Sequence, residues 1–338
     1  MSPPPAAVIA PSIGAIPASP PAAVSETQLR RQAFLAAILA AMCIGCSAPL
    51  VRLADAGPAA IGFWRLFFAL GPSLVWAYAE HRSSVRRARL IGAAALLPSR
   101  RQVLLAMLAG LCFGGDLIVF HKGLAQTSTA NALLLGNLAV VFVFTFGWLI
   151  LRERPTRGLI VALVMALTGT AIIIGSSAWH ANGAGVRPVS VIGDLLCVAA
   201  ALFYAGYMLF TRAVRRAGRG EAVPLGGGMV SVIASATGAS LCLGWAVTTG
   251  ETLIPQSLQG LLAVIGLGLI AHAAGQGLAT FALGRLPAGV ISLVLLLQIV
   301  VGVSLAALLF GELPSLAVFV GGLLVVAGVA NARPGGPG

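Results

Sequence analysis

Apolar runs of about 20 residues follow one another along almost the whole chain, and each is long enough to cross a hydrocarbon core of about 30 Å as a helix. Hydrophobic residues make up 59% of the 338 positions and charged residues only 9%, against about 25% charged residues in soluble domains. The runs are continuous rather than alternating with a period of two, which excludes a transmembrane barrel. The sequence therefore predicts an all-α integral membrane protein.

Charges, prolines and glycines divide this apolar sequence into ten expected transmembrane helices, five in each half. The expected helices span residues 33–53, 59–80, 103–123, 127–151, 157–176, 190–212, 225–248, 258–283, 287–310 and 315–332. The predicted organisation is a disordered cytoplasmic tail (1–32), a first five-helix repeat (33–176), an outer linker (177–189), a second repeat (190–332) and a cytoplasmic tail (333–338). The first tail is rich in Pro, Ala and Ser and has no basic residue before Arg30, which is typical of disorder rather than of a cleaved signal.

The two halves contain an internal repeat. A shift of 159 positions aligns LILRERPTRGLIVALVMALTGTAIIIG with LLFGELPSLAVFVGGLLVVAGV without a gap, and superimposes Glu153 on Glu312 and Pro155 on Pro314. Because five is odd, the second copy enters the membrane from the opposite face, which gives the inverted repeats that many secondary transporters use for alternating access. The two glutamates are therefore expected at opposite faces, as structural corners, each capping the fifth helix of its own half.

The formal net charge of +12 indicates orientation rather than nucleic-acid binding, because the basic residues lie between the apolar runs. A cytoplasmic amino terminus places 17 of the 21 basic residues inside. The other four, Arg52, Arg65, Lys122 and Arg187, fall on the outer side or within helices. Both termini are therefore expected in the cytoplasm.

Three stretches carry a family resemblance: SAPLVRLADAGPAAIGFWRLFFAL, TSTANALLLGNLAVVFVFTFGWLILRERPT and LLFGELPS. Together they resemble the EamA-type, ten-helix members of the drug/metabolite transporter superfamily, and the likeness covers residues from about 33 to 332. The resemblance implies a carrier of the bacterial inner membrane, commonly an exporter of amino acids, with helices one to four and six to nine around a central cavity. Many relatives carry a proline in the fourth helix where this chain has Ala139 and Val140, which leaves open whether that helix is kinked.

Ionisable side chains within a bilayer are functional candidates, because each costs about 2.5 to 3.5 kcal/mol at a helix centre. Asp116 is expected in the third helix and His272 near the middle of its counterpart, the eighth. If both face the cavity, they could pair, bind an ammonium group or exchange a proton; alternatively, Asp116 only fixes the bundle through hydrogen bonds. Arg65, about two turns into the second helix, could clamp a substrate carboxylate, or it could pair structurally with Asp55.

Uncharged hydrogen-bonding side chains are predicted to complete the cavity, and they suit a zwitterion with a variable side chain better than a polyanion. Each alone could equally hold helices together. They are Asn131, Asn137, Tyr204, Tyr207, Gln276, Ser292 and Gln298.

The motifs that would indicate other functions are missing from the sequence. No G-x-x-x-x-G-K-[ST] loop occurs, so ATP drive is unsupported. CIGC at 43–46 lacks the second ligand pair that zinc needs, so no metal or cofactor is expected. A membrane enzyme would need a nucleophile, base or metal constellation, of which Asp116 and His272 give at most two members.

The sequence therefore predicts a secondary-active or facilitative exporter of amino acids, aromatic or other neutral ones, or of related small metabolites. The alternatives are an exporter of drugs or nucleosides, and a receptor or scaffold that transports nothing. The expected partners are a small-molecule substrate and the lipid bilayer, without nucleic acid. Proton coupling stays open, as does the choice between a monomer and a weak homodimer.

Overall fold

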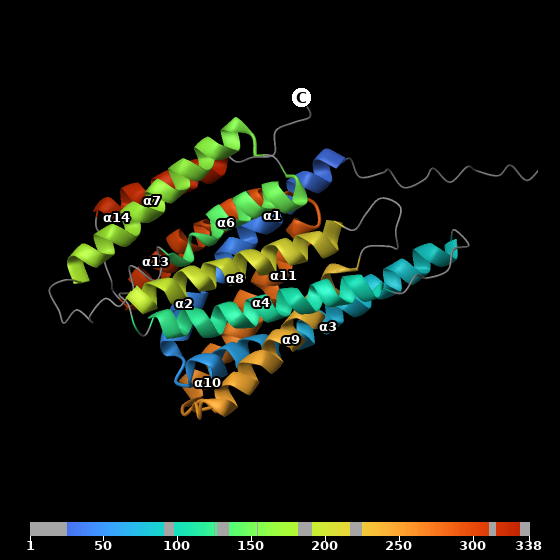
Figure 1. The fold of residues 1–338 in the computed structure, drawn as a ribbon, viewed down its shortest axis with the longest axis horizontal. Coiled ribbons are helices and arrows are strands. Elements are labelled where there is room, and N and C mark those ends of the chain that lie inside the picture. Colours follow the sequence, from blue (N-terminus) through green and yellow to red (C-terminus); the bar gives the residue numbers. More distant parts are fainter. Residues whose placement is uncertain are drawn as a thin grey trace, which may run out of the picture.

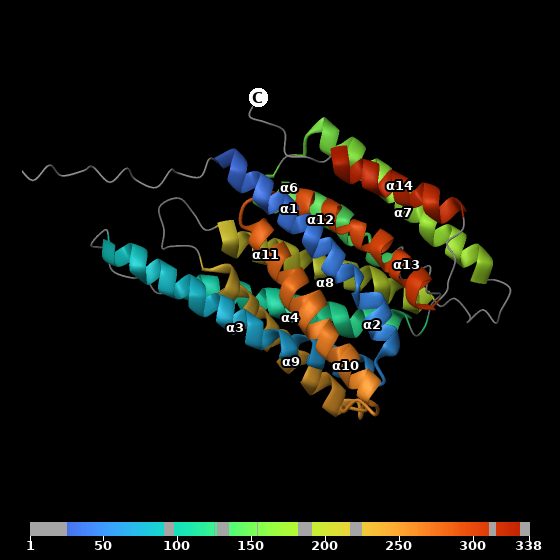
Figure 2. The same cartoon turned by 180° about the vertical axis from the view of Figure 1, so that it is seen from behind.

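The structure, a computed structural model, describes residues 26–90, 98–124, 126, 135–153, 155–181, 191–216, 225–310 and 316–331 (Figures 1 and 2). Within these ranges every regular element is a helix, and no strand occurs. Asn131, Glu312 and Pro314 lie outside the described residues.

The first repeat provides five helix positions. The first position is divided into α1 (Glu26–Gly45) and α2 (Ser47–Leu53), and it is followed by α3 (Pro58–Leu90) and α4 (Arg100–Leu124). The fourth and fifth positions are α6 (Ala139–Leu151) and α7 (Arg157–Ala181). Each overlaps a stretch of sequence that hydropathy predicts to be a helix, and α1, α3 and α7 extend beyond the predicted range.

The second repeat provides the other five positions. They begin with α8 (Val191–Arg216) and α9 (Gly227–Thr248). The eighth position is a continuous rod of α10 (Leu258–Gly266), the π-helix η1 (Leu267–Gln276) and α11 (Gly277–Leu283). The ninth comprises α12 (Ala288–Leu295) and α13 (Leu297–Phe310), and the tenth is α14 (Leu316–Asn331). Seven of the described helical spans are long and apolar enough to cross a membrane, and three shorter apolar helices occupy the remaining positions, which confirms the prediction of a ten-helix membrane protein.

Helices of one repeat pack mainly against helices of the other. α4 packs against α8 and α9, α3 against α9 and η1, and α1 against η1, α11 and α13. Exchanging the two halves maps the contact of α4 with α8 onto the contact of η1 with α1, as two equivalent repeats require. The centre of the bundle is therefore the interface between the repeats.

The fifth and tenth helices form a separate pair at one edge of the bundle, where Figures 1 and 2 both show α7 beside α14. Two glycines that the internal repeat superimposes, Gly169 and Gly328, allow this close contact. A Cβ on Gly328 would lie 2.8 Å from the carbonyl oxygen of Ala162, and a Cβ on Gly169 would overlap the carbonyl oxygen of Gly321. Small residues at such contacts let membrane helices approach closely.

The fourth and ninth helices are interrupted at equivalent positions. The amide of Val140 donates to the carbonyl of Asn137 at 3.2 Å, and 159 residues later the amide of Ile299 donates to the carbonyl of Leu296 at 3.1 Å. Both bonds join residues three apart, so each helix tightens locally before it continues as α6 or α13. The fourth helix is therefore interrupted without a proline at Ala139 or Val140.

Candidate functional site

A cluster of buried polar and aromatic side chains lies between the repeats near the middle of the bundle. This central cluster consists of Phe113 on α4, Tyr207 on α8, Ser235 on α9, and His272 and Gln276 on η1, and each is at most 6% exposed. His272 Nε2 is 2.9 Å from Ser235 Oγ, and the Tyr207 hydroxyl donates to Gln276 Oε1 at 3.4 Å. The ring of Phe113 lies 4.8 Å from that of Tyr207 and 5.1 Å from that of His272. The rings of Phe113, from the first repeat, and Tyr207, from the second, thus form an aromatic wall, and the polar groups of the cluster come from the second repeat.

The central cluster borders a small cavity of about 10 Å³, which is room for about one water molecule. Its lining consists of Ser73, Phe113, Tyr207, Ser231, Ala234, Ser235, His272, Gln276 and Gly277. Larger molecules could enter only if the surrounding helices moved apart. The π-helix supplies two of the lining residues, His272 and Gln276, and Gly277 follows it directly. Such segments are frequent at functional sites.

Arg65 lies beside the central cluster on α3 and is only 8% exposed. Its Cζ atom lies 5.6 Å from the centroid of the Phe113 ring, and its Nε atom is buried without a hydrogen-bond partner among the described residues. Asp116 is the one carboxylate in the described part of the chain that interacts electrostatically with Arg65, yet the two groups form no ion pair within 4.0 Å. A buried guanidinium with an unpartnered donor is therefore next to the cavity wall.

The structure contradicts the alternative pairing of Arg65 with Asp55. The Asp55 carboxylate instead accepts a hydrogen bond from the backbone amide of Gln256 at 3.0 Å, at the start of α10. A hydrogen bond from the Ser257 side chain, assisted by backbone amides, lowers the pKa of the Asp55 carboxyl below its usual value. Asp55 thus serves as a helix cap, because the loop that carries it lies over the amino terminus of α10.

The other predicted cavity residues are distributed more widely than the sequence suggests. Tyr204 joins the aromatic wall, with its ring 5.9 Å from that of Tyr207. Ser292 donates its hydroxyl to the carbonyl of Gly289 in its own helix, and Gln298 lies where α13 meets α1. Asn137 lies at the interruption of the fourth helix. Ser292, Gln298 and Asn137 do not line the cavity.

Sequence inspection missed Phe113, Ser231 and Ser235, which all line the cavity. Helical spacing offered a signal for each: Phe113 precedes Asp116 by three residues, and the two serines are four residues apart. Residues three or four apart share one face of a helix. The signal was weak, because Phe and Ser are common in membrane helices.

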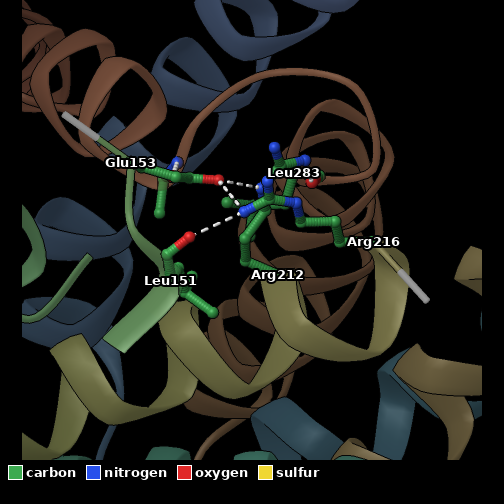
Figure 3. A network of polar contacts seen from close by, with 6 residues as sticks. Leu151, Glu153, Arg212, Arg216 and Leu283 are labelled. Atoms are coloured by element: carbon green, nitrogen blue, oxygen red, sulfur yellow. Dashed lines mark hydrogen bonds and ion pairs between the residues drawn. The ribbon is translucent and has the colours of Figure 1, made fainter. Parts of the chain in front are cut away.

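A second polar network closes one end of the bundle, around Glu153 (Figure 3). Glu153 Oε1 accepts from Arg212 Nε at 2.8 Å, and Oε2 accepts from the backbone amide of Ala288 at 2.9 Å. Arg212 also donates to the carbonyl of Leu283 at 2.6 Å, and Arg216 lies 3.5 Å from Glu153 Oε1. This Glu153 network joins the loop after α6 to α8 and to the start of α12.

The expectation that Glu153 caps the fifth helix is wrong. Thr156 caps α7 through the amide of Leu159, at 3.3 Å, and Glu153 caps α12 of the other repeat. The reason is the turn before it: Arg152 adopts a left-handed conformation with φ of 56°, and the amide of Glu153 bonds back to Gly147. This turn separates the glutamate from the helix that follows it in sequence.

Reciprocal caps of the same kind join α3 and α9. Glu80 of the first repeat accepts from the amides of Gly227 and Gly228, at 3.2 and 2.9 Å. Glu251 of the second repeat accepts from the amides of Ala59 and Ala60, at 2.7 and 3.2 Å. A carboxylate stabilises the positive end of a helix dipole. Most carboxylates at the ends of the described bundle cap a helix of the opposite repeat in this way.

A larger cavity, of about 580 Å³, opens beside the Glu153 network. Its basic lining residues, Arg30, Arg212, Arg216 and Arg285, define what we call the basic end of the bundle. Apolar side chains of α6, α7 and α12 also line this cavity, including Val143, Leu159 and Val290. The charge of this end matches the positive stretches that set membrane orientation.

Comparison with known proteins agrees with this architecture. A solved structure described as "Crystal structure of protein" superposes with a TM-score of 0.66 and 22% sequence identity, over 90% of this chain and 96% of that chain. A search of curated proteins finds no significant match. The family model described as "EamA-like transporter family" matches twice, at residues 31–175 and 191–332, so that each repeat corresponds to one copy. The chain therefore belongs to the EamA-like transporter family, and it is a membrane transporter.

Proposed function

We propose that this transporter exports an amino acid, or a closely related small zwitterion, across the bacterial inner membrane. The observation that carries the proposal is the central cluster, because it gathers aromatic rings, hydroxyls and an amide at the interface of the two repeats. Such a mixture of apolar walls and a few polar groups is typical of small-molecule sites. The aromatic rings of the cluster can contact a variable apolar side chain of the substrate. The hydroxyls and the amide can form hydrogen bonds with the substrate's polar groups.

The proposed mechanism is alternating access, in which one repeat moves against the other around this site. Three features support it: the cavity has room only for about one water molecule, the fourth and ninth helices are interrupted at equivalent positions, and the eighth helix contains a π segment at the cavity. Irregular turns of this kind are common hinge positions. Paired hinges, one in each repeat, would let either end open while the other stays closed.

The positive-inside tendency supports placing the basic end in the cytoplasm, with both termini there. In that orientation the Glu153 network lies on the cytoplasmic side of the central cluster. Arg212 and Ala288 belong to the second repeat and Glu153 to the first. A relative movement of the repeats that opened the cytoplasmic side would therefore have to loosen these bonds.

Asp116 and His272 are the residues we propose for any coupling to protons. Both lie in membrane-spanning helices, and His272 lines the central cavity. A histidine and a carboxylate in such positions are typical of proton relays in transporters. The hydrogen bond between His272 and Ser235 would then change with each proton exchanged.

Counterflow in proteoliposomes tests the function directly. Vesicles loaded with an unlabelled amino acid should accumulate the labelled one above the level of empty vesicles, across a panel that also contains nucleosides and small drugs, with and without a pH gradient. Ser235→Ala should slow exchange, because it removes the partner of His272. Ser240→Ala is the matched control, since Ser240 lies on the same helix, is exposed and donates to the carbonyl of Ala236 in its own helix. Failure of every amino acid to support exchange would overturn the proposed substrate class.

A further inference from the structure

We infer that Arg65 is the residue that binds the substrate carboxylate, and this inference rests on the proposed function of amino-acid transport. The first ground is that a buried charge without a partner is costly. Arg65 is as little exposed as Arg212, at 8%, yet Arg212 has a carboxylate and a carbonyl as partners and Arg65 has neither among the described residues. If the substrate carboxylate is the missing partner of Arg65, the protein keeps this costly buried charge because substrate binding needs it.

The second ground is that the two carboxylates at the amino-terminal end of α3 already have other partners. Asp55 bonds the start of α10, and Glu251 bonds the start of α3, seven residues before Arg65. Asp116 interacts with Arg65 only through its field, without an ion pair. The described part of the chain therefore supplies Arg65 with an attractive charge nearby but leaves its buried Nε atom without an acceptor.

The third ground is position. Arg65 lies seven residues beyond Pro58, which at 1.5 Å per residue is roughly 10 Å into the helix. Its guanidinium carbon lies 5.6 Å from the Phe113 ring, and the same ring forms the wall of the central cavity against Tyr207 and His272. A carboxylate bound at Arg65 would place the rest of its molecule along this aromatic wall.

The chemistry of the site narrows the substrate class. A guanidinium presents parallel N–H groups that match the two oxygens of a carboxylate. The neighbouring Asp116 carboxylate suits an ammonium group, and the rings of Phe113, Tyr204 and Tyr207 suit an apolar or aromatic side chain. The site therefore fits α-amino acids with apolar or aromatic side chains, and it disfavours amines, esters and amides that lack the carboxylate.

The test compares substrates that differ only at the carboxyl group. Counterflow of the best-transported amino acid is measured against its amide, its methyl ester and its decarboxylated amine, in wild type, Arg65→Gln and Arg65→Lys. We expect the wild type to prefer the acid at least tenfold over each analogue. Arg65→Gln should lower transport of the acid at least tenfold and bring the acid-to-amide ratio close to one. Arg65→Lys should fall between, because it keeps the charge but loses the paired donors.

Arg82→Gln is the matched control, because Arg82 lies on the same helix, is exposed and lies over the ring of Tyr78, away from the central cluster. Size-exclusion profiles in detergent check that each variant is folded, and the Lys variant keeps the test decisive if the Gln variant is not. If the wild type transports amino acids but accepts the amide equally, or if Arg65→Gln keeps the preference for the acid, the inference falls while the proposed function stands. If the wild type transports no amino acid, both fall.

Discussion

Arg65 and Arg212 are equally buried arginines with opposite surroundings. Arg212 lies at the basic end, where Glu153 and the carbonyl of Leu283 satisfy its guanidinium. Arg65 lies within α3 beside Phe113, and its Nε has no partner in the described chain. The contrast teaches that burial alone does not define the role of a charge in a membrane bundle. A paired arginine joins helices, and an unpaired one beside a cavity is available to a ligand.

The largest effect on stability is expected from Glu153→Ala, which would turn Arg212 into an unpaired buried charge. Removing one partner of a buried ion pair costs about 3 to 5 kcal/mol. The variant should therefore unfold at a clearly lower temperature in detergent, while the substrate preference of the surviving protein stays unchanged. Glu26→Ala is the control, because the pair of Glu26 with Arg30 is exposed and such pairs are worth about 0 to 1 kcal/mol. A changed preference at normal stability would mean that Glu153 acts on substrate.

The opposite result is expected at Arg65. Replacing an unpaired buried charge with an apolar side chain of similar length removes a desolvation cost, so Arg65→Met should raise the free energy of unfolding by about 1 to 3 kcal/mol. Transport of amino acids should be lost in the same variant. Thermal unfolding and counterflow on one preparation measure both quantities. A large loss of stability would show that Arg65 is a structural residue like Arg212.

Smaller effects are expected from the reciprocal caps. Glu251→Ala removes the acceptor for the amides of Ala59 and Ala60 at the start of α3, and loss of a cap costs about 0.5 to 2 kcal/mol. Glu80→Ala should cost a similar amount at the start of α9. Unfolding in detergent tests both, and strongly unequal losses would argue that the two repeats are not equivalent at these caps.

The smallest effect is expected at Asp55 and depends on pH. Its pKa is lower in the folded protein than in the unfolded chain, so its contribution to stability is present above the unfolded value and is lost as pH falls through the folded value. Wild type should therefore be more stable than Asp55→Asn near neutral pH, and the difference should shrink below a pH of about 4. Melting temperatures from neutral to acid pH measure it, and a constant difference would contradict the role of the charge.

The sequence predicted the helices well and their irregularities poorly. Hydropathy found all ten helix positions, but α3 continues to Leu90, ten residues beyond its predicted end, because a polar helical extension carries no apolar signal. The π segment around His272 and the interruption at Asn137 were not predicted either, since both depend on how neighbouring helices pack. The site shows the same division: Tyr207, His272 and Gln276 were found as polar residues in apolar runs, and Phe113 was not.

By itself, the sequence determined the membrane class, the number of helices and their inverted repetition. Hydropathy is a local property of each stretch of chain, and the repeat appears when two stretches are aligned. Only the tertiary structure decided which charges are paired. Glu153 meets Arg212 across 59 residues and Ala288 across 135, and no local pattern specifies such contacts. The two glutamates that the repeat superimposes looked like caps of their own helices, whereas the described one caps the opposite repeat. The physical reason is that hydropathy acts along the chain, while pairing depends on which helices the folded bundle brings together.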